Sequence, residues 1–531
     1  MNSLAGTGKL MRLVLRRDRL RLPIWIMMLA GFVVFTAGAL VELYATEASR
    51  IQLIATFGSN PAYVALLGPM YDTSLGALTA WRIGTFGSVL VGLMAVLTVI
   101  RHTRDEEETG RRELLGATVV GRHAPLTAVL LVVVGGGLLI GLLVAAGLIS
   151  LDLPARGAVA YGLGWAAVAT VFTTVGMVAA QLTQSGGTAR GVGVGILGVA
   201  FLLRAAGDAG EVEVLGWLSP IGWFTRLRPY AGERFWVLAL YAGLAVSFGA
   251  IAFAIASRRD IGSGAFSPRV GPATAGVGLR SPVGLAWQLQ RGSLLGWTVG
   301  LAVVAALYGN ITNSVDDIVT DNPQIAEIVE AIGGGEALTD AFFSFSTGIF
   351  ALIAAAYSIR TALRLRAEED SLRAEPVLAT ATSRPRWMNS HLLFAALGPA
   401  VMLPVAGLVM GGIFGAAIGD VGGQLSRGLT TALIQLPAVW VLTGATAALF
   451  GVLPRLTAVS WGLLVTFLIL GQLGQILEFP QWLLNLSPFT HVAGLTPADV
   501  GLSPVLWLAA IAALLIAAGL VGFRRRDLQS A

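Results

Sequence analysis

Two charged segments of this chain carry the same ionic residues at the same spacing. Residues 104–118 are RDEEETGRRELLGAT and residues 366–380 are RAEEDSLRAEPVLAT. Six ionic or polar residues coincide when the segments are aligned at an offset of 262 residues. Opposite charges three or four residues apart pair on one face of a helix. The pattern therefore predicts Glu107 beside Arg104 and Arg111 on one helical face, and an equivalent set in the second segment.

Two interpretations of these segments stay open. They are either solvated helix ends whose charges pair with each other, or coupling helices that dock onto a partner protein. The repetition favours docking, because a two-fold symmetric partner needs two equivalent contacts. The candidate coupling residues are Arg104, Glu106, Glu107, Arg111 and Glu113 in the first segment, and Arg366, Glu368, Glu369, Arg373 and Glu375 in the second.

The sequence lacks the residue patterns that metal binding, thiol chemistry and nucleotide binding require. The 531-residue chain has no Cys, which excludes thiolate metal sites and thiol nucleophiles, and its four His are scattered, so no metal site is expected. A phosphate-binding loop needs Ser or Thr after its Lys, but Leu10 follows the one Lys, Lys9. Ser185-Gly186-Gly187 lies in a short loop between predicted spans. No nucleotide or other cofactor is therefore expected in this chain.

The elements that position the charged segments are predicted to be membrane-spanning helices. Charged residues make up 12% and apolar residues 55%, whereas soluble proteins carry about 25% charged residues. This excludes soluble domains, nucleic-acid binders and disordered scaffolds. A span needs about 20 apolar residues, and twelve stretches meet this test in two sets of six. They lie near 22–45, 81–100, 126–150, 158–182, 191–206 and 236–256, and near 293–310, 343–362, 391–418, 428–451, 458–476 and 502–522.

The charges between the spans predict the orientation. The two termini and the loops on their side carry 27 basic and 12 acidic residues, whereas the opposite loops carry 8 basic and 18 acidic residues. Basic residues concentrate in the cytoplasmic loops of membrane proteins. We therefore expect a multi-pass protein of a bacterial plasma membrane with both termini in the cytoplasm. The bacterial assignment comes from the bias toward Arg, Ala and Gly.

Further matches extend the repeat over the chain. Leu218-Ser219-Pro220 recurs as residues 486–488 before the sixth span, and Arg258-Arg259-Asp260 recurs as residues 525–527 after it. The fold class is therefore predicted to be all-α, with twelve transmembrane helices in two tandem six-helix repeats of parallel orientation. The first repeat is placed at 1–256, a cytoplasmic linker at 257–283 and the second repeat at 284–531. Residues 8–20 are expected to form an interfacial helix, and 283–291 its repeat.

The residues of the predicted spans bear on the energy source for transport and on the path of the substrate. Their interiors contain no Asp, Glu or His that could bind a coupling ion, and Glu42, Arg82, Arg204 and Arg360 lie at span ends, where long side chains reach the interface. This argues against an ion-coupled carrier, which stays an alternative. A membrane-embedded lipid enzyme lacks the required polar cluster. Candidate substrate-path residues are Phe86, Met94, Phe350, Tyr357, Gln472 and Gln475, although packing would also explain each of them.

Two fused six-span units with E-E-x-x-x-R-x-E after each second span and R-R-D after each sixth span resemble the permease subunits of actinobacterial ATP-binding-cassette exporters. The chain is similar to the polyketide-antibiotic exporters of the tetronasin-resistance type. The resemblance implies two copies of a separate ATPase subunit, which hold ATP and Mg. It also implies export of amphipathic drugs or antibiotics, or of a lipid or cell-envelope component, with the Glu-rich segments at the ATPase interface. Gly110 stands opposite Leu372, and Leu114 opposite Pro376, so the two contacts are expected to be unequal.

Overall fold

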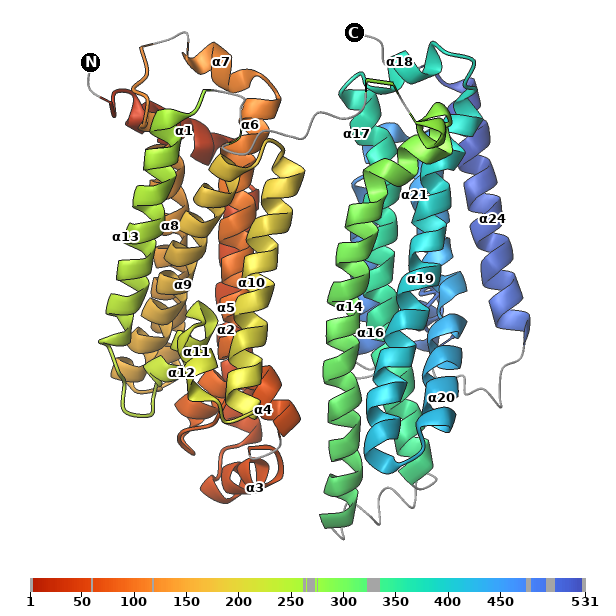
Figure 1. Cartoon of the computed structure of the whole chain (residues 1–531). Coiled ribbons are helices and arrows are strands. Elements are labelled where there is room, and N and C mark those ends of the chain that lie inside the picture. The colour runs from red at the N-terminus through yellow and green to blue at the C-terminus, as the bar shows by residue number, and fades with distance from the viewer. Residues whose placement is uncertain are drawn as a thin grey trace. The chain divides into compact units, whose positions relative to one another are not determined.

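The computed structural model describes residues 3–58, 61–116, 119–260, 264, 273–274, 276–321, 335–473, 479–492 and 502–527. Its regular secondary structure is helical, and these residues contain no β-strand. The chain divides into two compact units, Met1–Val270 and Gly271–Ala531, at a point inside the predicted linker. Figure 1 shows that each unit is a bundle of long helices with short helices at its ends.

Eleven helices of the described residues are long and apolar enough to cross a membrane. In unit 1 they include α10, which has few large apolar residues but is 24 residues long. The spanning helices of unit 1 are α2 (Arg21–Leu43), α5 (Leu75–His102), α8 (Ala124–Ser150), α9 (Ala155–Leu182), α10 (Gly186–Ala209) and α13 (Val237–Arg258).

Unit 2 supplies the other five, one of them built from two consecutive helices. The predicted span 428–451 contains a break at Gln435, because Pro437 follows at the start of the next helix and cannot donate a backbone hydrogen bond. The predicted span 458–476 is described as α22 (Val459–Leu468) and a π-helical turn (Ile469–Leu473), so the number twelve stays a prediction. The spanning helices are α14 (Pro282–Asp321), α16 (Gly335–Ala362), α19 (Arg384–Ile418), α20 (Val421–Ile434) with α21 (Leu436–Val452), and α24 (Leu502–Arg525).

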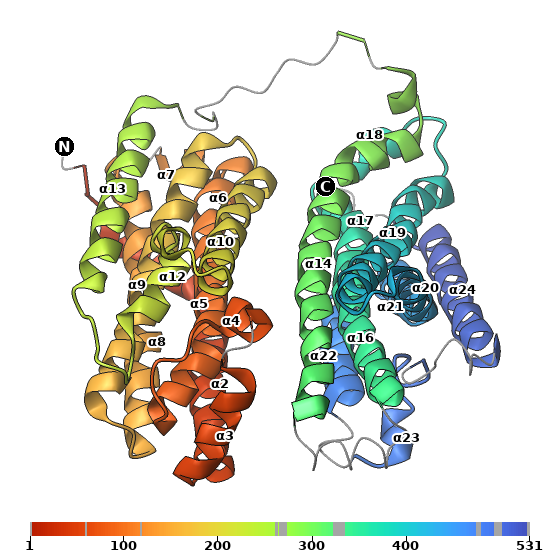
Figure 2. The same ribbon diagram turned by 60° about the horizontal axis from the view of Figure 1, so that its bottom comes forward.

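Helices at corresponding places in the two units pack in the same pairs. In unit 1, α9 lies at the centre against α5, α8 and α13, and α2 packs on α5 and α8. In unit 2, α20 and α21 together contact α16, α19 and α24, and α14 packs on α16 and α19. Figure 2 shows α20 and α21 between α16 and α24. The backbone N–H and C=O groups of a membrane-spanning helix form their hydrogen bonds within that helix. Neighbouring helices in these pairs therefore contact each other by packing and not by shared backbone hydrogen bonds.

The crossing of the third and fourth spans is a glycine pair in both units. A Cβ added to Gly162 in α9 would overlap the carbonyl oxygen of Gly141 in α8, and the converse holds for Gly141. In unit 2, Gly407 of α19 and Gly428 of α20 block each other's Cβ in the same way. Both pairs are 21 residues apart in sequence, at an offset of 266 residues from each other. Small residues allow helix backbones to approach this closely in membranes.

Short helices cover the two ends of unit 1. One end carries α1 (Thr7–Arg17), α6 (Arg104–Glu108) and α7 (Arg111–Gly116), and we call it the charged end. The other end carries α3 (Glu47–Phe57), α4 (Pro61–Leu67), α11 (Glu213–Trp217) and α12 (Pro220–Leu227). The charged end of unit 2 likewise carries α17 (Arg364–Asp370) and α18 (Ala374–Leu378).

The structure changes two expectations about span ends. Residues 283–291 are the first turns of α14, which bend away from the rest of that helix (Figure 2), and their interfacial position stays a prediction. Arg204 does not reach the interface, because α4 covers it. Its side chain is fully buried, donates to the carbonyl oxygens of Ala65 (2.8 Å) and Leu66 (3.1 Å), and lies 3.6 Å from Asp208. Arg204 therefore binds the C-terminal carbonyls of a short helix.

The glycine crossing predicts that Gly162→Ala destabilises unit 1. The added methyl must push α8 and α9 apart, an overpacking effect of about 1–3 kcal/mol. The matched control is Gly195→Ala in α10, where a Cβ meets nothing within 4 Å. Thermal unfolding of the two purified variants in the same detergent should show a lower midpoint for Gly162→Ala alone. Equal midpoints would mean that the crossing tolerates a wider separation.

Candidate functional site

The carboxylate of Glu107 is the centre of the charged end of unit 1. Its side chain is 1% exposed and accepts from Arg104 at 2.7 Å and from Arg259 at 2.7 and 2.9 Å. Arg112 forms a third ion pair with it. Arg259 also donates from Nε to the side-chain oxygen of Gln181 in α9 at 2.6 Å. One carboxylate therefore joins α6, α7 and the end of α13, and through Arg259 it is connected to α9.

Unit 2 contains the corresponding centre at Glu369, whose side chain is 2% exposed. Arg526 donates two parallel hydrogen bonds to it, at 2.8 and 2.6 Å, the strong bidentate geometry of a guanidinium and a carboxylate. The Arg526 guanidinium also lies over the rings of Phe450 and Phe523, at 4.9 and 5.1 Å from their centroids. Arg366 is farther from Glu369, at 3.8 Å.

These two centres pair the motifs that recur in the sequence. Arg259 and Arg526 are the second arginines of the two Arg-Arg-Asp motifs, and Glu107 and Glu369 are the second glutamates of the two charged segments. Each pair ties the short helix after the second span of its unit to the end of the last spanning helix. We call each pair a clamp. The first arginines of the motifs, Arg258 and Arg525, are exposed.

Both charged segments are a helix, a tight turn and a second helix. The turn contains Gly110 at φ +69° in unit 1 and Leu372 at φ +58° in unit 2. The same backbone bond closes it, from Gly110 N to the Glu107 oxygen and from Leu372 N to the Glu369 oxygen, each 3.0 Å. The Gly110–Leu372 difference therefore does not make the two backbones unequal. Leu372 instead holds a left-handed conformation that costs a non-glycine residue roughly 1–2 kcal/mol.

The turn separates the ten candidate coupling residues into two groups. The inner group lies on the first helix of each segment and is largely buried or paired. The outer group lies at or beyond the turn and is exposed. The predicted pairing of Arg111 with Glu107 is wrong, because Gly110 redirects the chain and Arg111 lies 3.7 Å from Glu106 instead. The inner group is Arg104, Glu106, Glu107, Arg366, Glu368 and Glu369, and the outer group is Arg111, Glu113, Arg373 and Glu375.

The acidic residues of α6 also bind the neighbouring helices. Glu106 pairs with Arg17 of α1 at 2.5 Å. Asp105 pairs with Arg190 of α10 at 2.8 Å, and Glu108 accepts from the backbone N–H of Gly186 at the start of α10. Acidic side chains are stabilised at a helix N-terminus. The first charged helix is therefore fixed on both sides, which leaves the second helix as the accessible part.

Burial and repulsion between like charges lower the pKa values of arginines around Glu107. Burial, with repulsion from Arg259 and Arg104, lowers the pKa of Arg112 to about 10. Burial also lowers the pKa of Arg259. With a pKa of about 10, the Arg112 guanidinium stays protonated at neutral pH. Among the described residues, no group of three or more His, Asp or Glu side chains could hold a metal ion.

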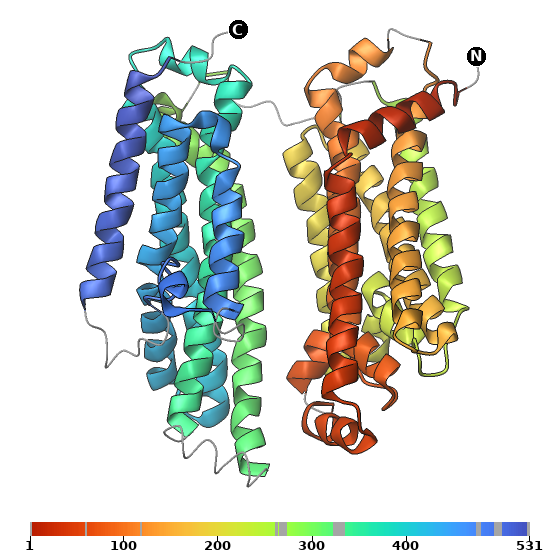
Figure 3. The same ribbon diagram turned by 180° about the vertical axis from the view of Figure 1, so that it is seen from behind.

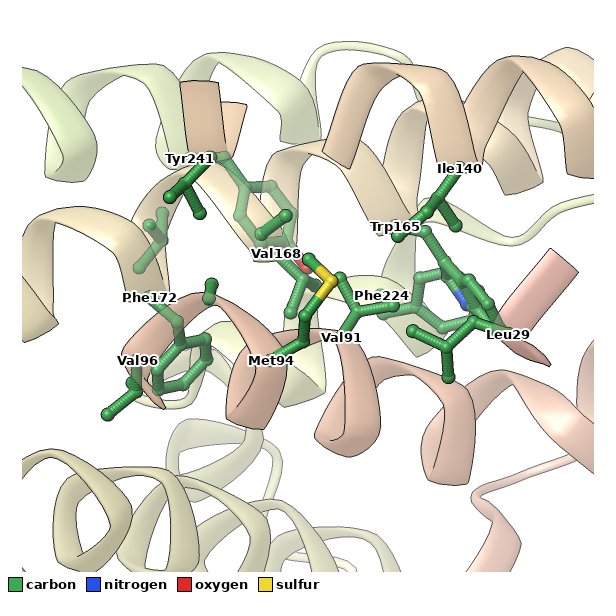
Figure 4. Packing of buried hydrophobic residues seen from close by; sticks show 14 of the residues in the cluster. Leu29, Val91, Met94, Val96, Ile140, Trp165, Val168, Phe172, Phe224 and Tyr241 are labelled. Atoms are coloured by element: carbon green, nitrogen blue, oxygen red, sulfur yellow. The ribbon is translucent and has the colours of Figure 1, made fainter. Parts of the chain in front are cut away.

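Three candidate substrate-path residues lie inside their own units. Met94 is fully buried in the cluster that Figure 4 shows, near Val91 and Phe172. Phe350 and Tyr357 are fully buried in unit 2. These three side chains are packed within their units, whereas Phe86 is 41% exposed. Gln472 lies in the π-helical turn without a described side chain, and Gln475 lies outside the described residues.

The sequence alone did not predict several of the arginines that bind Glu107 and Glu369. The Arg-Arg-Asp motifs were recognised as repeat markers, but nothing local in the sequence pairs Arg259 with a glutamate 152 residues away. Arg112 was missed because its counterpart in the second segment is Ala374. The available signal was the joint recurrence of two ionic motifs, one acidic and one basic, in both halves.

The helices and their charged ends define a helical, multi-pass membrane protein. A domain family described as the C-terminal domain of the multidrug efflux system permease Rv1217c matches residues 279–524. The chain is 45% identical over 525 residues to the multidrug efflux system permease protein Rv1217c of Mycobacterium tuberculosis, covering 99% of this chain and 95% of the relative. The chain therefore belongs to the family of this multidrug efflux permease.

The first clamp predicts a large effect of Glu107→Gln. The neutral amide leaves buried guanidinium groups without their counterion, and breaking a buried ion pair costs about 3–5 kcal/mol. Glu113→Gln is the matched control, because Glu113 is exposed on the neighbouring helix and its loss should cost within about 0.5 kcal/mol. Thermal unfolding in detergent compares the two. A Glu107→Gln midpoint as high as that of the control would refute the clamp.

The two turns predict opposite effects of reciprocal substitutions. Leu372→Gly relieves left-handed strain at a 39% exposed side chain and should stabilise the protein by about 1 kcal/mol. Gly110→Leu introduces the same strain in unit 1 and should destabilise by a similar amount, since a Cβ there meets no neighbour. Unfolding midpoints of both variants test this. Shifts of the same sign would show that factors other than φ decide.

Proposed function

We propose that this chain is the membrane-spanning subunit of an ATP-driven exporter of amphipathic drugs. In this proposal two copies of a separate ATP-binding-cassette ATPase hold ATP and Mg, and the charged ends of both units face the cytoplasm. The two units are then tandem six-helix repeats of the same orientation. The permease family supports a transport subunit, and the name of the Mycobacterium tuberculosis relative supports drugs as its cargo.

The recurrence of the clamp carries this proposal. Glu107 with Arg259 and Glu369 with Arg526 build the same connection in both units, from residues at matching places in the sequence. The common helix pairs and the common glycine crossings support the repeat independently. A protein with two equivalent charged ends suits a partner present in two copies.

The exposed second helices are the docking elements in this mechanism. Arg111 and Glu113 on α7, and Arg373 and Glu375 at α18, are available to a partner surface. Force applied to α7 or α18 passes through the clamp to the last spanning helix of the unit. In unit 1 it also reaches α1 and α10 through Glu106 and Asp105. Each unit then moves as one body, which suits alternating access by rocking of the two units.

An ion-coupled carrier is the second candidate. Among buried acidic groups of the described spanning helices, Asp208 at the end of α10 would be its ion-binding residue. However, Asp208 lies 3.6 Å from Arg204 and 3.4 Å from Arg226. Two guanidinium groups compete with a cation for this carboxylate, so the observation favours the ATP-driven mechanism. Export of a polyketide antibiotic or of a lipid stays a finer assignment within it.

Inverted membrane vesicles that contain this chain together with a candidate ATP-binding-cassette ATPase test the proposal. Drug uptake should require hydrolysable ATP and persist after collapse of the proton and sodium gradients. The double variant Arg111→Glu with Arg373→Glu should lose ATPase co-purification and ATP-driven uptake, because it reverses the exposed charge of both docking elements.

Arg258→Glu with Arg525→Glu is the matched control, since these arginines are exposed at the same ends but lie outside the docking helices. It should retain assembly and uptake. Uptake that stops when the gradients collapse would refute the ATP-driven mechanism. Normal assembly of the Arg111/Arg373 double variant would refute only the assignment of the docking helices.

A further inference from the structure

A pocket lies at the charged end of unit 1, beneath the interfacial helix α1. Figure 3 shows α1 lying across the ends of α2 and α8. The pocket is bounded by α1, by the end of α5, by α6 and α7, and by the first turns of α8. It therefore lies where α1 meets the start of a spanning helix. In the proposed orientation this is the level at which a lipid headgroup meets its acyl chains.

The lining of the pocket is divided into an apolar and a cationic part. Leu13 on α1 and Pro125 and Val129 on α8 belong to the apolar part. Arg17 and Arg112 form the cationic part, and the carboxylate of Glu106, which pairs with Arg17, also lines the pocket. Two guanidinium groups outnumber this one carboxylate, so the charged side of the pocket carries a net positive charge. The apolar part extends along α8 toward the spanning region, whereas the cationic part borders the charged helices. A ligand that fits both parts is amphipathic and anionic.

The cationic part is only partly neutralised by protein carboxylates. Arg112 has to share Glu107 with Arg104 and Arg259. Arg17 pairs with one oxygen of Glu106, to which Arg111 is also close. The nearby Asp18 is occupied by His102 at 2.6 Å and Arg101 at 3.1 Å. Glu107 is thus shared and Asp18 is paired, whereas the second oxygen of Glu106 has no hydrogen-bond partner among the described residues. Arg112 borders the pocket with a shared counterion.

Unit 2 lacks this combination. The residue that corresponds to Arg112 at the repeat offset is Ala374, and no separate helix corresponds to α1, because residues 282–321 form one helix. The pocket is therefore a feature of the first unit and not a general consequence of the repeat.

We propose that this pocket binds the headgroup of an anionic phospholipid of the cytoplasmic leaflet, with the phosphate at Arg17 and Arg112 and an acyl chain along Leu13 and the start of α8. Anionic lipids concentrate at the cytoplasmic surface and are attracted to basic interfacial helices. The apolar wall favours a lipid over an acidic segment of a cytoplasmic protein, which would leave that wall uncovered. The inference rests on the proposed orientation of the chain, but not on its cargo or energy source.

Lipid binding to the purified full chain tests the site without an ATPase or a drug. The probes are phosphatidylglycerol and phosphatidylcholine with identical acyl chains in mixed micelles, and inorganic phosphate alone. Bound lipid is measured by native mass spectrometry and by the shift of the unfolding midpoint. The wild type should bind phosphatidylglycerol more tightly than phosphatidylcholine. Arg112→Ala, which copies the residue of unit 2, should weaken phosphatidylglycerol binding about tenfold, the size of one charge-assisted hydrogen bond.

Two further variants keep the test decisive. Arg111→Ala is the matched control, because this neighbouring arginine does not line the pocket, and it should bind like the wild type. Leu13→Trp fills the apolar part without a change of charge and should also weaken phosphatidylglycerol binding. It decides the question if Arg112→Ala does not fold.

Three results would overturn the inference. Equal losses for Arg111→Ala and Arg112→Ala would indicate attraction to surface charge in general. The same stabilisation by inorganic phosphate as by phosphatidylglycerol would indicate a free-anion site. Normal phosphatidylglycerol binding by Arg112→Ala would refute the headgroup site, and loss of ATPase co-purification by the same variant in a separate experiment would assign the pocket to a protein contact. Only the third result bears on the proposed ATPase interface, so failure of the lipid site leaves the proposed function intact.

Discussion

An ionised carboxylate that is 1% exposed has to be neutralised by groups that the fold brings to it, and this requirement organises the charged end of unit 1. Burial of an unpaired charge costs several kcal/mol. Arg104 and Arg112 supply part of this neutralisation from the charged segment itself, and Arg259 adds to it from the end of the last spanning helix. The clamp therefore couples the position of the charged segment to the position of the last spanning helix. Glu369 and Arg526 impose the same condition in unit 2.

The glycine crossings supply the matching constraint inside the bundles. Gly141 with Gly162, and Gly407 with Gly428, fix the closest approach of the third and fourth spans by contact between backbones, and backbone contact cannot adapt as long side chains do. Together with the clamp, each crossing limits how the helices of one unit can move against each other. A unit restrained at its centre and at its charged end transmits force as a body. The proposed ATP-driven mechanism requires this property in both units, and both units contain the clamp and the glycine crossing.

The sequence predicted the features that depend on local information. Span positions follow from the length of apolar stretches, so even the Gly-rich α10 was located, and the charged segments were recognised by their recurring spacing. The pairing of Glu107 with Arg259 depends on a contact across 152 residues, which no local pattern contains. The predicted pairing of Arg111 with Glu107 was wrong because the turn at Gly110 interrupts the helix. Side chains after this turn no longer lie on the face that carries Glu107. A leucine in the sequence does not predict a left-handed conformation. Leu372 opposite Gly110 therefore predicted a difference between two turns whose backbones agree.

The two clamps share a geometry but differ in charge and surroundings. Around Glu107 three guanidinium groups share one carboxylate, and Arg259 has the amide of Gln181 as a further partner. Around Glu369 a single bidentate arginine is supported by two aromatic rings. Aromatic faces stabilise a guanidinium without adding charge, so the second clamp is more self-contained, whereas the first places Arg112 at the border of a pocket. In the proposed tandem repeat this divergence is allowed, because a mutation in one half of the chain has no obligatory copy in the other half. The shared geometry then serves the docking proposed for both units, and Arg112 belongs to the headgroup site proposed for unit 1 alone.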